Sequence, residues 1–402
     1  MTDQQKWLSR RYLAYRLTSN LWFVAAVWLY FYRIYITDQQ VGFLDAMAFS
    51  IGLLAEVPSG ALADKFGRDK IVRLGLVLSG SGILIQAVGS SFMPFFVGQT
   101  IMMIGVSFVS GADQALFFDK LKFNSSSTHW RKLMTRGSQA TLIGTLLATM
   151  VGGWLHTINP RIPWFLTGSS FILSSFFIWG IVDDRPKKLR KKFTAEVKEY
   201  VVDVKTGFKE FNSRKLKIYV PLIVTVQGLF YTNGFGILRP VLLDRFSFSP
   251  FWGSVAIATS GLATVVFLSI MHKHSDRLSE KHVISTISFL SVISLIFSIF
   301  NVGYWGYLVV ITLYASEYLL HPFMSETLNY HAPENQRATV LSVASFFSTL
   351  PYVVLAPTIG FLNYRGKLSY FLIGWSILIL ASVAYYLSSK RRDSKIELEV
   401  II

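Results

Sequence analysis

Residues Gly52–Arg73 read GLLAEVPSGALADKFGRDKIVR, and this stretch decides the fold class. An apolar segment that carries Glu56 and Pro58 runs into the charged turn Gly60–Arg68, and a second apolar segment follows. The two glycines of the turn, Gly60 and Gly67, let helix ends approach closely, and Asp64 is placed to accept from the backbone N–H groups of a neighbouring helix start. The basic residues are expected at the membrane surface. The stretch therefore predicts a tight, charged connection between two membrane helices.

The composition also points to a membrane protein. Hydrophobic residues make up 52% of the chain and charged residues 15%, and 33 of the 402 residues are Phe. A soluble core would not bury so much apolar surface, so we expect a polytopic membrane protein. The absence of cysteine excludes disulfides, thiolate metal sites and cysteine nucleophiles. The polar, basic start of the chain lacks a cleavage site, so the first apolar segment is expected to act as its own signal.

Each membrane crossing needs about 20 apolar residues. Twelve stretches meet this requirement: 12–36, 41–62, 70–89, 93–119, 133–155, 163–182, 217–243, 250–271, 282–300, 303–330, 338–361 and 368–389. They predict an all-α polytopic membrane protein made of two six-helix bundles. The predicted parts are an N-terminal bundle, a cytoplasmic linker, a C-terminal bundle and a cytoplasmic tail, at 1–182, 183–216, 217–390 and 391–402.

The positive charges predict the orientation. Most of the 39 Lys and Arg residues lie in the terminal tails and in alternate connections, beginning with 63–69. The opposite connections hold only Arg161, Arg245, Arg365 and Lys367. Cytoplasmic loops carry the excess of Lys and Arg, so both termini are predicted to be cytoplasmic. The net charge of +16 is then a topology signal, and we expect no nucleic-acid partner.

The long connection 183–216 has an amphipathic pattern. Its apolar residues recur at spacings of three and four: Phe193, Val197, Tyr200, Val201, Val204, Phe208 and Phe211. This pattern predicts a helix that lies on the inner leaflet. The alternative is a regulatory docking site.

A faint internal repeat relates the two halves. Residues Ala63–Val72 align without gaps on Ser275–Ile284, and both fall between the second and third segments of their halves. A parallel repeat of this kind builds rocker-type transporters, in which a central cavity lies between the halves. The repeat and the predicted topology therefore agree.

The signature Gly60-x-x-x-Asp64-x-x-Gly67-Arg68, with twelve segments and a long central loop, resembles the major facilitator superfamily over the whole chain. The lead-in Glu56-Val-Pro58-Ser-Gly60 is similar to a set of bacterial members with Glu-x-Pro-Ser/Thr-Gly at this place. The resemblance implies an alternating-access carrier of a small solute, often driven by an ion gradient.

The resemblance also implies a cytoplasmic latch that closes in the outward-open state. Its members here would be Asp64, Arg68 and, by position, Asp119 at the inner end of the fourth segment. The alternative is an ordinary interfacial salt-bridge cluster without a gating role, because exposed ion pairs contribute little.

In the second half, Asp276 or Arg277 is expected to pair with Glu326 in the same way. Ser279 and Glu280 replace the Gly-Arg of the first half there, so this second latch should be weaker.

Ionisable residues inside a membrane are costly and are candidates for function. The proton-coupling candidates are Glu56, Asp113, Glu317 and His321. Glu317 lies nearest to the middle of the membrane in the second half, four residues before His321, so the pair would share one helix face and a proton. The structural alternatives are a helix-bend fixture at Glu56 and a Glu–His hydrogen bond that pins adjacent helices.

Two arginines lie near the outer face. Arg33 and Asp45 flank a short turn and are expected to form a structural ion pair, and Arg239 is followed by Asp244 in a similar arrangement. The alternative is capture of an anionic substrate. Further side chains are candidates for lining the substrate cavity: Asn20, Trp28, Arg33, Gln114, Gln227, Tyr231, Asn233 and Arg239.

The fifth segment contains Gly144-x-x-x-Ala148-Thr149-x-x-Gly152-Gly153, which partly matches a glycine-rich motif of the superfamily's drug/proton antiporters. Ala148 and Thr149 stand where that motif has Gly-Pro. Small residues at this spacing also allow close helix packing, and we favour that interpretation.

No phosphate-binding loop, zinc-hydrolase motif or metal-ligand spacing occurs, so we expect no enzyme activity, cofactor, metal or ATP dependence. The sequence predicts a monomeric secondary active transporter of the cell (inner) membrane, with proton-coupled efflux of a small amphipathic or cationic compound. Its expected partners are that substrate, protons or another coupling ion, and the lipid bilayer. The alternatives are uptake of an anionic metabolite, flipping of a lipid-like solute, or a non-transporting membrane sensor.

Overall fold

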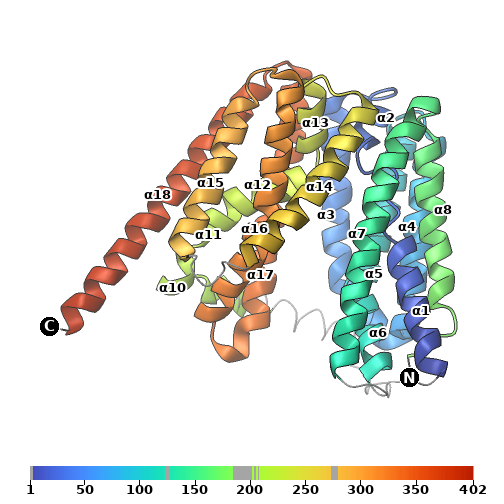
Figure 1. Ribbon diagram of the computed structural model, residues 1–402, viewed down its shortest axis with the longest axis horizontal. Helices are drawn as coiled ribbons and strands as arrows, with labels where there is room; N and C mark the ends of the chain where they lie inside the picture. The colour runs from blue at the N-terminus through green and yellow to red at the C-terminus, as the bar shows by residue number, and fades with distance from the viewer. Residues whose placement is uncertain are drawn as a thin grey trace. The chain divides into compact units, whose positions relative to one another are not determined.

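The computed structural model describes residues 3–122, 127–183, 202, 205–206, 208–272 and 279–401. Every regular element in these ranges is helical (Figure 1). The elements of the first half are α1 (Asp3–Thr18), α2 (Trp28–Tyr32), α3 (Asp38–Phe66), α4 (Arg68–Val88), α5 (Phe92–Val109), α6 (Ala112–Lys122), α7 (Ser127–Ile158) and α8 (Ile162–Ile178). Those that follow the linker are α10 (Arg214–Lys217), α11 (Val220–Leu222), η1 (Ile223–Gln227), α12 (Gly228–Gly234), α13 (Leu238–Arg245), α14 (Pro250–His272), α15 (Glu280–Phe297), η3 (Gly303–Trp305), α16 (Gly306–His331), η4 (Glu334–Gln336), α17 (Arg337–Tyr364) and α18 (Leu368–Ile401).

The chain divides into two compact units. Unit 1 comprises Met1–Lys198 and Pro250–Ala258, and unit 2 comprises Glu199–Ser249 and Thr259–Ile402. The main division falls inside the predicted linker 183–216. In unit 1, α4 packs against α5 and α8, α3 packs against α5, and α1 packs against α7 and α8. In unit 2, α15 packs against α16 and α18, and α12 packs against α17 and α16.

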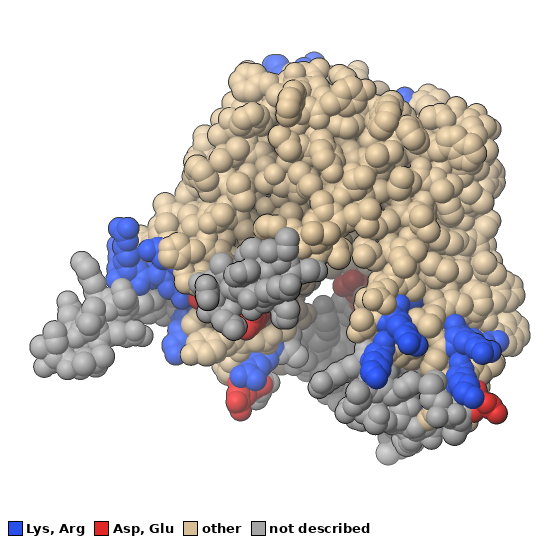
Figure 2. Space-filling view, in the orientation of Figure 1, with Lys and Arg blue, Asp and Glu red and all other residues tan. Residues whose placement is uncertain are grey.

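The predicted all-α polytopic fold is confirmed. Seven helices in the described residues are long and apolar enough to cross a membrane, or up to nine if each of two bent pairs counts as one span. Nine of the twelve predicted segments coincide with these helices or bent pairs. The other three coincide with α1, α8 and α16, which are shorter or more polar. In unit 1, Figure 2 shows Lys and Arg gathered at the end where the chain begins, whereas the flanks of the helices carry few charges.

The first predicted segment, 12–36, is not one continuous helix. Helix α1 ends at Thr18 and α2 begins at Trp28. Two polar side chains at the break bond the backbone of the last turn: Ser19 Oγ donates to Tyr15 O at 2.7 Å, and Asn20 Nδ2 donates to Arg16 O at 2.8 Å. Such bonds compete with the helical backbone pattern and explain why the helix stops early.

The seventh segment, 217–243, is also broken. It consists of α11, the π-helical turn η1, α12 and α13, and its two parts are bent by 68°. Pro221 lies in the first turn of α11, Gly234 ends α12, and Gly236 lies within the break before α13. Single π-helical turns within α-helices frequently mark functional sites. The fourth segment has a smaller interruption at Gly111, where φ is +72° between α5 and α6.

Most of the amphipathic pattern predicted for the linker lies outside the described residues, namely Phe193, Val197, Tyr200, Val201 and Val204. Its last two aromatic residues are described. Phe208 and Phe211 place their rings 5.1 and 5.4 Å from that of Phe347 on α17, and Phe211 is buried. These two side chains therefore contact protein, and the expectation that they face the inner leaflet is wrong for Phe211.

Candidate functional site

A charged pair is buried in unit 2, between the broken seventh span and α16. Arg239 Nη2 lies 3.5 Å from Glu317 Oε2, and the side chains are 11% and 18% exposed. Arg239 follows the bend, near the start of α13, whereas Glu317 lies in the middle of α16. A buried charge that loses its partner is strongly unfavourable, so each residue requires the other.

The surroundings of this pair are aromatic and incompletely hydrogen-bonded. The Arg239 guanidinium lies 4.8 Å from the centre of the Tyr314 ring, a favourable cation–π geometry. Gly234 is tight against Glu317, because a Cβ atom there would overlap the carboxylate. Buried Asn233 Nδ2 and Arg239 Nε have no hydrogen-bond partner in the structure.

The predicted partner of Glu317 was His321, and this prediction is wrong for the structure. His321 is exposed on α16, and the charged group at Glu317 is Arg239. Four residues place two side chains on one helix face. The bend of the seventh span brings a stronger partner from another helix.

In unit 1, Asp113 is buried at the start of α6. Tyr15 on α1 donates from its hydroxyl to Asp113 Oδ2 at 2.8 Å, and the backbone N–H of Gln114 donates to Oδ1 at 2.7 Å. Tyr15 is itself buried, with its ring stacked on Phe117 at 5.5 Å. Asp113 therefore ties the first span to the fourth, whereas the Gln114 side chain is exposed.

Glu56 is exposed on α3, beside the proline that bends this helix. The segments Asp38–Glu56 and Pro58–Phe66 form an angle of 46°. Ser59 Oγ donates to the Glu56 carbonyl at 2.7 Å, which satisfies one group near the proline. The structure thus shows the helix bend that was one interpretation of this stretch.

The signature turn is shorter than the predicted Gly60–Arg68. Helix α3 continues to Phe66, Gly60 lies within it, and a Cβ atom on Gly60 would meet nothing within 4 Å. Gly67 alone makes the turn, with φ +99° and ψ 136°, a conformation that other residues rarely adopt. The expected close approach at Gly60 is therefore wrong, because the helix has not yet ended there.

Arg68 is the centre of the charged cluster at this turn. Its Nη1 donates to Asp119 Oδ2 at 2.7 Å, and its backbone N–H donates to Asp183 Oδ2 at 3.1 Å. Asp119 is the acid at the inner end of the fourth segment that the family resemblance indicates as the partner of Arg68. The sequence predicts that Asp64 accepts from the backbone at a helix start. At the start of α4, the acceptor is Asp183, which follows α8, and Asp64 is exposed.

The corresponding place in unit 2 is organised around Glu280. Its Oε1 accepts from the hydroxyls of Tyr219 and Tyr386, both at 2.7 Å, and lies 3.3 Å from Lys390 Nζ. The predicted latch residues Asp276 and Arg277 lie outside the described residues, and Glu326 is exposed on α16.

The other candidates for the cavity have mixed surroundings. Arg33 forms a bidentate pair with Asp38 at 2.7 and 2.8 Å, and Asp45 accepts from Gln99 Nε2 at 3.1 Å. Tyr231 packs against Phe235 and Tyr352, Gln227 is half-buried at the end of η1, and Trp28 meets Tyr32 edge to face. Asn20 is used at the break of the first span.

The glycine run of α7 serves close packing. A Cβ atom at Gly152 would overlap the backbone of Phe23, and one at Gly144 would lie 3.0 Å from Leu17 Cδ1. Thr149, at the place of a motif residue, is buried and donates back to Thr145 O at 2.7 Å.

Several residues of these sites escaped the sequence reasoning: Tyr15, Asp183, Tyr219, Tyr314, Tyr386 and Lys390. Tyr and Lys residues near span ends are common, and nothing in the sequence pairs them with distant carboxylates. Glu280 is the exception, because the internal repeat aligns this acid with Arg68 and so indicates a charged cluster at its position. Among the described residues, no group of three or more His, Asp or Glu side chains is placed to hold a metal ion.

The fold places the chain in the class of all-helical, polytopic membrane proteins. The family model of the Major Facilitator Superfamily matches residues 12–356. The chain therefore belongs to the major facilitator superfamily, and it is a multi-pass transporter for a small-molecule substrate.

Several curated proteins are similar over most of the chain. The uncharacterized MFS-type transporter YxaM of Bacillus subtilis (strain 168) is 19% identical over 375 residues, which cover 90% of each chain. The quinolone resistance protein NorA of Staphylococcus aureus (strain N315) is 24% identical, covering 78% of this chain and 80% of NorA. The multidrug resistance protein 2 of B. subtilis (strain 168) is 22% identical, covering 86% and 85%.

Solved transporter structures share the fold. The nucleoside transporter NupG matches with a TM-score of 0.74 at 11% identity, covering 97% of this chain and 99% of NupG. A peptide transporter POT in complex with sulfate matches with a TM-score of 0.71 at 13% identity, covering 96% and 95%. At such identities the likeness concerns the fold alone.

Proposed function

We propose that the protein is a proton-coupled efflux transporter of the cell membrane, which exports a small amphipathic or cationic compound as a monomer. The observation that carries this proposal is the buried pair of Glu317 and Arg239 at the bend of the seventh span. The names of the relatives NorA and multidrug resistance protein 2 support the direction of transport.

Glu317 is the residue to which we assign the proton. While its carboxylate is ionised, the pair holds α16 against the bent seventh span. Protonation would remove the negative charge and leave the Arg239 guanidinium buried without its counter-ion, which is strongly unfavourable. The seventh span, already broken into short helices, would then move so that Arg239 gains another partner. Proton binding and helix movement are coupled in this way.

A cationic substrate fits the same chemistry. Carboxylates and aromatic faces both attract cations, and Glu317 lies next to Tyr314 and Tyr318 on α16. A cation that competes with Arg239 for Glu317 would exclude the proton, which is the requirement for antiport. Asp113 and Glu56 are the corresponding acids of unit 1, where Asp113 is the better buried.

Uptake of an anionic metabolite is the second candidate, and it depended on Arg33 and Arg239. Both guanidiniums already face carboxylates, Asp38 and Glu317. An anion would have to displace a bonded carboxylate in either place, so we favour the cation. A non-transporting sensor would leave Glu317 dispensable.

The cytoplasmic latch is a further part of the proposal. The Arg68–Asp119 pair joins the third and fourth spans at the signature turn, with Asp183 on the backbone of Arg68. We assign it the role of holding unit 1 in the outward-open form. The subgroup lead-in Glu56-Val-Pro58-Ser-Gly60 supports a bacterial inner membrane.

The test uses purified protein in proteoliposomes with an imposed pH gradient and a panel of fluorescent cations. Substrate transport should be driven by the gradient, and substrate addition should move protons in the opposite direction. Glu317→Gln should abolish the proton-driven part of transport. Glu334→Gln is the matched control, because it makes the same change in unit 2 at a side chain that is 91% exposed and belongs to none of the proposed sites.

Three outcomes would contradict the proposal. Proton-driven transport that survives in Glu317→Gln would remove Glu317 from the coupling. Proton movement in the same direction as the substrate would indicate symport. The absence of flux for every compound of a panel that includes anions and lipid analogues would favour the sensor.

A further inference from the structure

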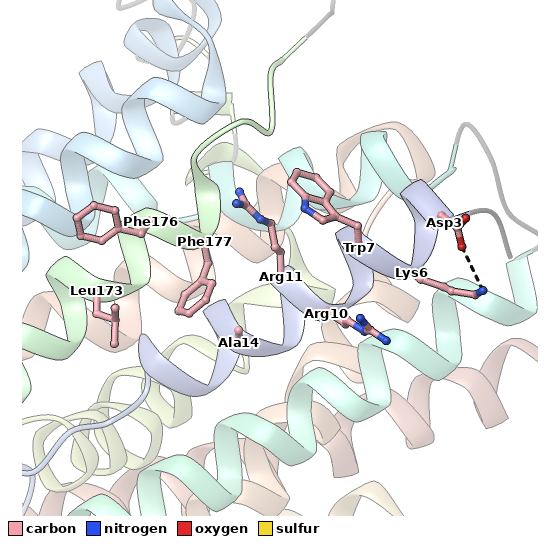
Figure 3. A pocket seen from close by; sticks show the side chains of 9 residues that line it. All are labelled: Asp3, Lys6, Trp7, Arg10, Arg11, Ala14, Leu173, Phe176 and Phe177. Carbon is pink, nitrogen blue, oxygen red and sulfur yellow. Dashed lines mark hydrogen bonds and ion pairs between the residues drawn. The ribbon is translucent and has the colours of Figure 1, made fainter.

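A groove in unit 1 lies between the N-terminal helix α1 and the end of α8, outside the sites described above. Its volume is about 690 Å³. Its lining residues come from one face of each helix and are shown in Figure 3: Asp3, Lys6, Trp7, Arg10, Arg11, Ala14, Leu173, Phe176 and Phe177. Spacings of three and four residues place the α1 members on a single stripe.

One end of the groove is basic. Lys6, Arg10 and Arg11 bring three positive charges, and Asp3 is the single acid of the lining. Asp3 lies 3.3 Å from Lys6 Nζ, but both side chains are exposed, so this pair contributes little. Figure 3 shows Lys6 and Arg10 along one edge of the α1 face and Arg11 along the other. The groove therefore offers an excess of positive charge.

Arg11 is held in place by the protein. Its Nη1 donates to the backbone carbonyl of Trp179, which directly follows α8, and its guanidinium lies 4.3 Å from the centre of the Trp7 ring. These contacts fix α1 to the end of α8 and orient the cation before any ligand binds. Pre-oriented groups lose less entropy on binding.

The remaining wall is apolar and open. Trp7, Leu173 and Phe176 are 42%, 49% and 56% exposed, and Ala14 and Phe177 complete the surface. The apolar side chains of α8 belong to the predicted sixth span, and the basic side chains of α1 precede the first span. Trp side chains prefer the boundary between lipid and water. In the orientation that the positive charges predict, the basic end of the groove faces the cytoplasm and its apolar wall faces the membrane.

We propose that this groove binds an anionic phospholipid of the inner leaflet. The phosphodiester lies between Lys6, Arg10 and Arg11, and one acyl chain lies along Leu173, Phe176 and Ala14. Charge complementarity selects the anionic head group, since Lys and Arg near the membrane surface attract anionic lipid. The apolar wall selects a lipid over a soluble phosphate, which would leave that wall in water. This inference does not depend on the transported solute.

The test is native mass spectrometry of the full-length, detergent-purified protein titrated with phosphatidylglycerol, phosphatidylcholine or glycerol 3-phosphate. Wild-type protein should retain one phosphatidylglycerol at concentrations at which phosphatidylcholine does not bind. Lys6→Gln/Arg10→Gln should weaken this binding by roughly 10- to 30-fold, since each Lys or Arg near the surface contributes about a factor of five.

Lys132→Gln/Arg136→Gln is the matched control. It removes the same charges from exposed positions of α7 in the same unit, neither of which lines the groove, and should leave the tight site intact. Ala14→Leu tests the apolar part without changing the charge, and it should weaken phosphatidylglycerol binding by filling the groove. The thermal unfolding temperature of each variant, measured without added lipid, shows whether it is folded.

Three results would overturn the proposal. Equal binding of phosphatidylcholine would show that the charge does not select the lipid. Competition by glycerol 3-phosphate at similar concentrations would assign the site to a soluble phosphate. An unchanged affinity in folded Lys6→Gln/Arg10→Gln, or an equal loss in the α7 control, would remove the site from the groove.

Discussion

The two halves of the chain place a charged residue at the same position of the internal repeat and use it differently. Arg68 begins α4 in unit 1, and Glu280 begins α15 in unit 2. Arg68 reaches Asp119 on the fourth span, whereas Glu280 accepts from Tyr219 on the seventh and from Tyr386 and Lys390 on the twelfth. The position is retained, but the sign of the charge and the helices that it joins are not.

The same position in the repeat therefore does not give Arg68 and Glu280 the same role. A repeat can preserve the place where a helix starts, because that place follows from the length of the hairpin. The partner depends on the sign of the charge and on which neighbours carry the opposite sign. In unit 1 the result is an ion pair between partly exposed side chains of the third and fourth spans. In unit 2 it is a cluster in which Glu280 has three partners from two further helices. We therefore expect gating at Arg68 and rigidity at Glu280.

The largest effect is expected from Glu280→Ala. The change leaves Lys390 and two tyrosine hydroxyls without their acceptor, and hydrogen bonds to a charged group are worth about 1.5–3 kcal/mol each. We expect the free energy of unfolding to fall by about 3 kcal/mol, measured by denaturant titration in mixed micelles. Glu334→Ala is the control, because that side chain is 91% exposed and lies 3.9 Å from Arg337. Equal losses in both variants would refute the rigid cluster.

Gly67→Ala tests the backbone part of the comparison. Gly67 has φ +99°, whereas Ser279, its counterpart in the repeat, has φ −77° and accepts from the backbone N–H of His282 at 3.4 Å. Alanine at position 67 should cost about 1–3 kcal/mol through strain, and Ser279→Ala about 1 kcal/mol through loss of a helix cap. The same unfolding titration measures both. A smaller loss at position 67 than at 279 would contradict this ranking.

The Arg68–Asp119 pair should affect transport more than stability. Both side chains are partly exposed, at 22% and 38%, so a double-mutant cycle should give a coupling free energy of about 0.5–1 kcal/mol. Arg68→Asp and Asp119→Arg should each reduce transport in proteoliposomes, and the double swap should restore part of it. Lack of any rescue would leave the pair as an ordinary surface contact.

The smallest effect concerns pH. His331, the last residue of α16, stacks on Tyr219 with ring centres 5.7 Å apart. Burial lowers the pKa of His331 below 6.5, and the charge of Lys390 adds to this effect. A lowered pKa means that the unfolded chain binds the proton more readily, so this contribution to stability is complete above about pH 6.5 and is lost as the pH falls below it.

His331→Phe keeps the ring but not the proton, so it should reduce the fall in unfolding temperature between pH 7.5 and pH 5.5. The thermal unfolding of both proteins at the two pH values gives the comparison. An identical pH dependence of wild type and variant would show that His331 does not contribute to it.

The sequence determined the class of fold. Apolar stretches of span length and the alternation of Lys- and Arg-rich connections predict a twelve-span, all-helical chain, and the turn around Gly67 and Arg68 indicates the family. These features are local, because each span must satisfy its own backbone hydrogen bonds and keep most charges out of the lipid. Asp119 was indicated by the family resemblance, which implies an acid at the inner end of the fourth segment, and it does bond Arg68.

Only the tertiary structure decided the partners. Glu317 was predicted to bond His321 because four residues separate them, but the bend of the seventh span brings Arg239 to it. Tyr15 reaches Asp113, and Asp183 replaces Asp64 at the start of α4, across separations that no local pattern encodes. Breaks in helices and the sign of distant charges set these contacts. The sequence therefore identifies the buried acids, whereas the packing of the helices decides which group bonds each of them.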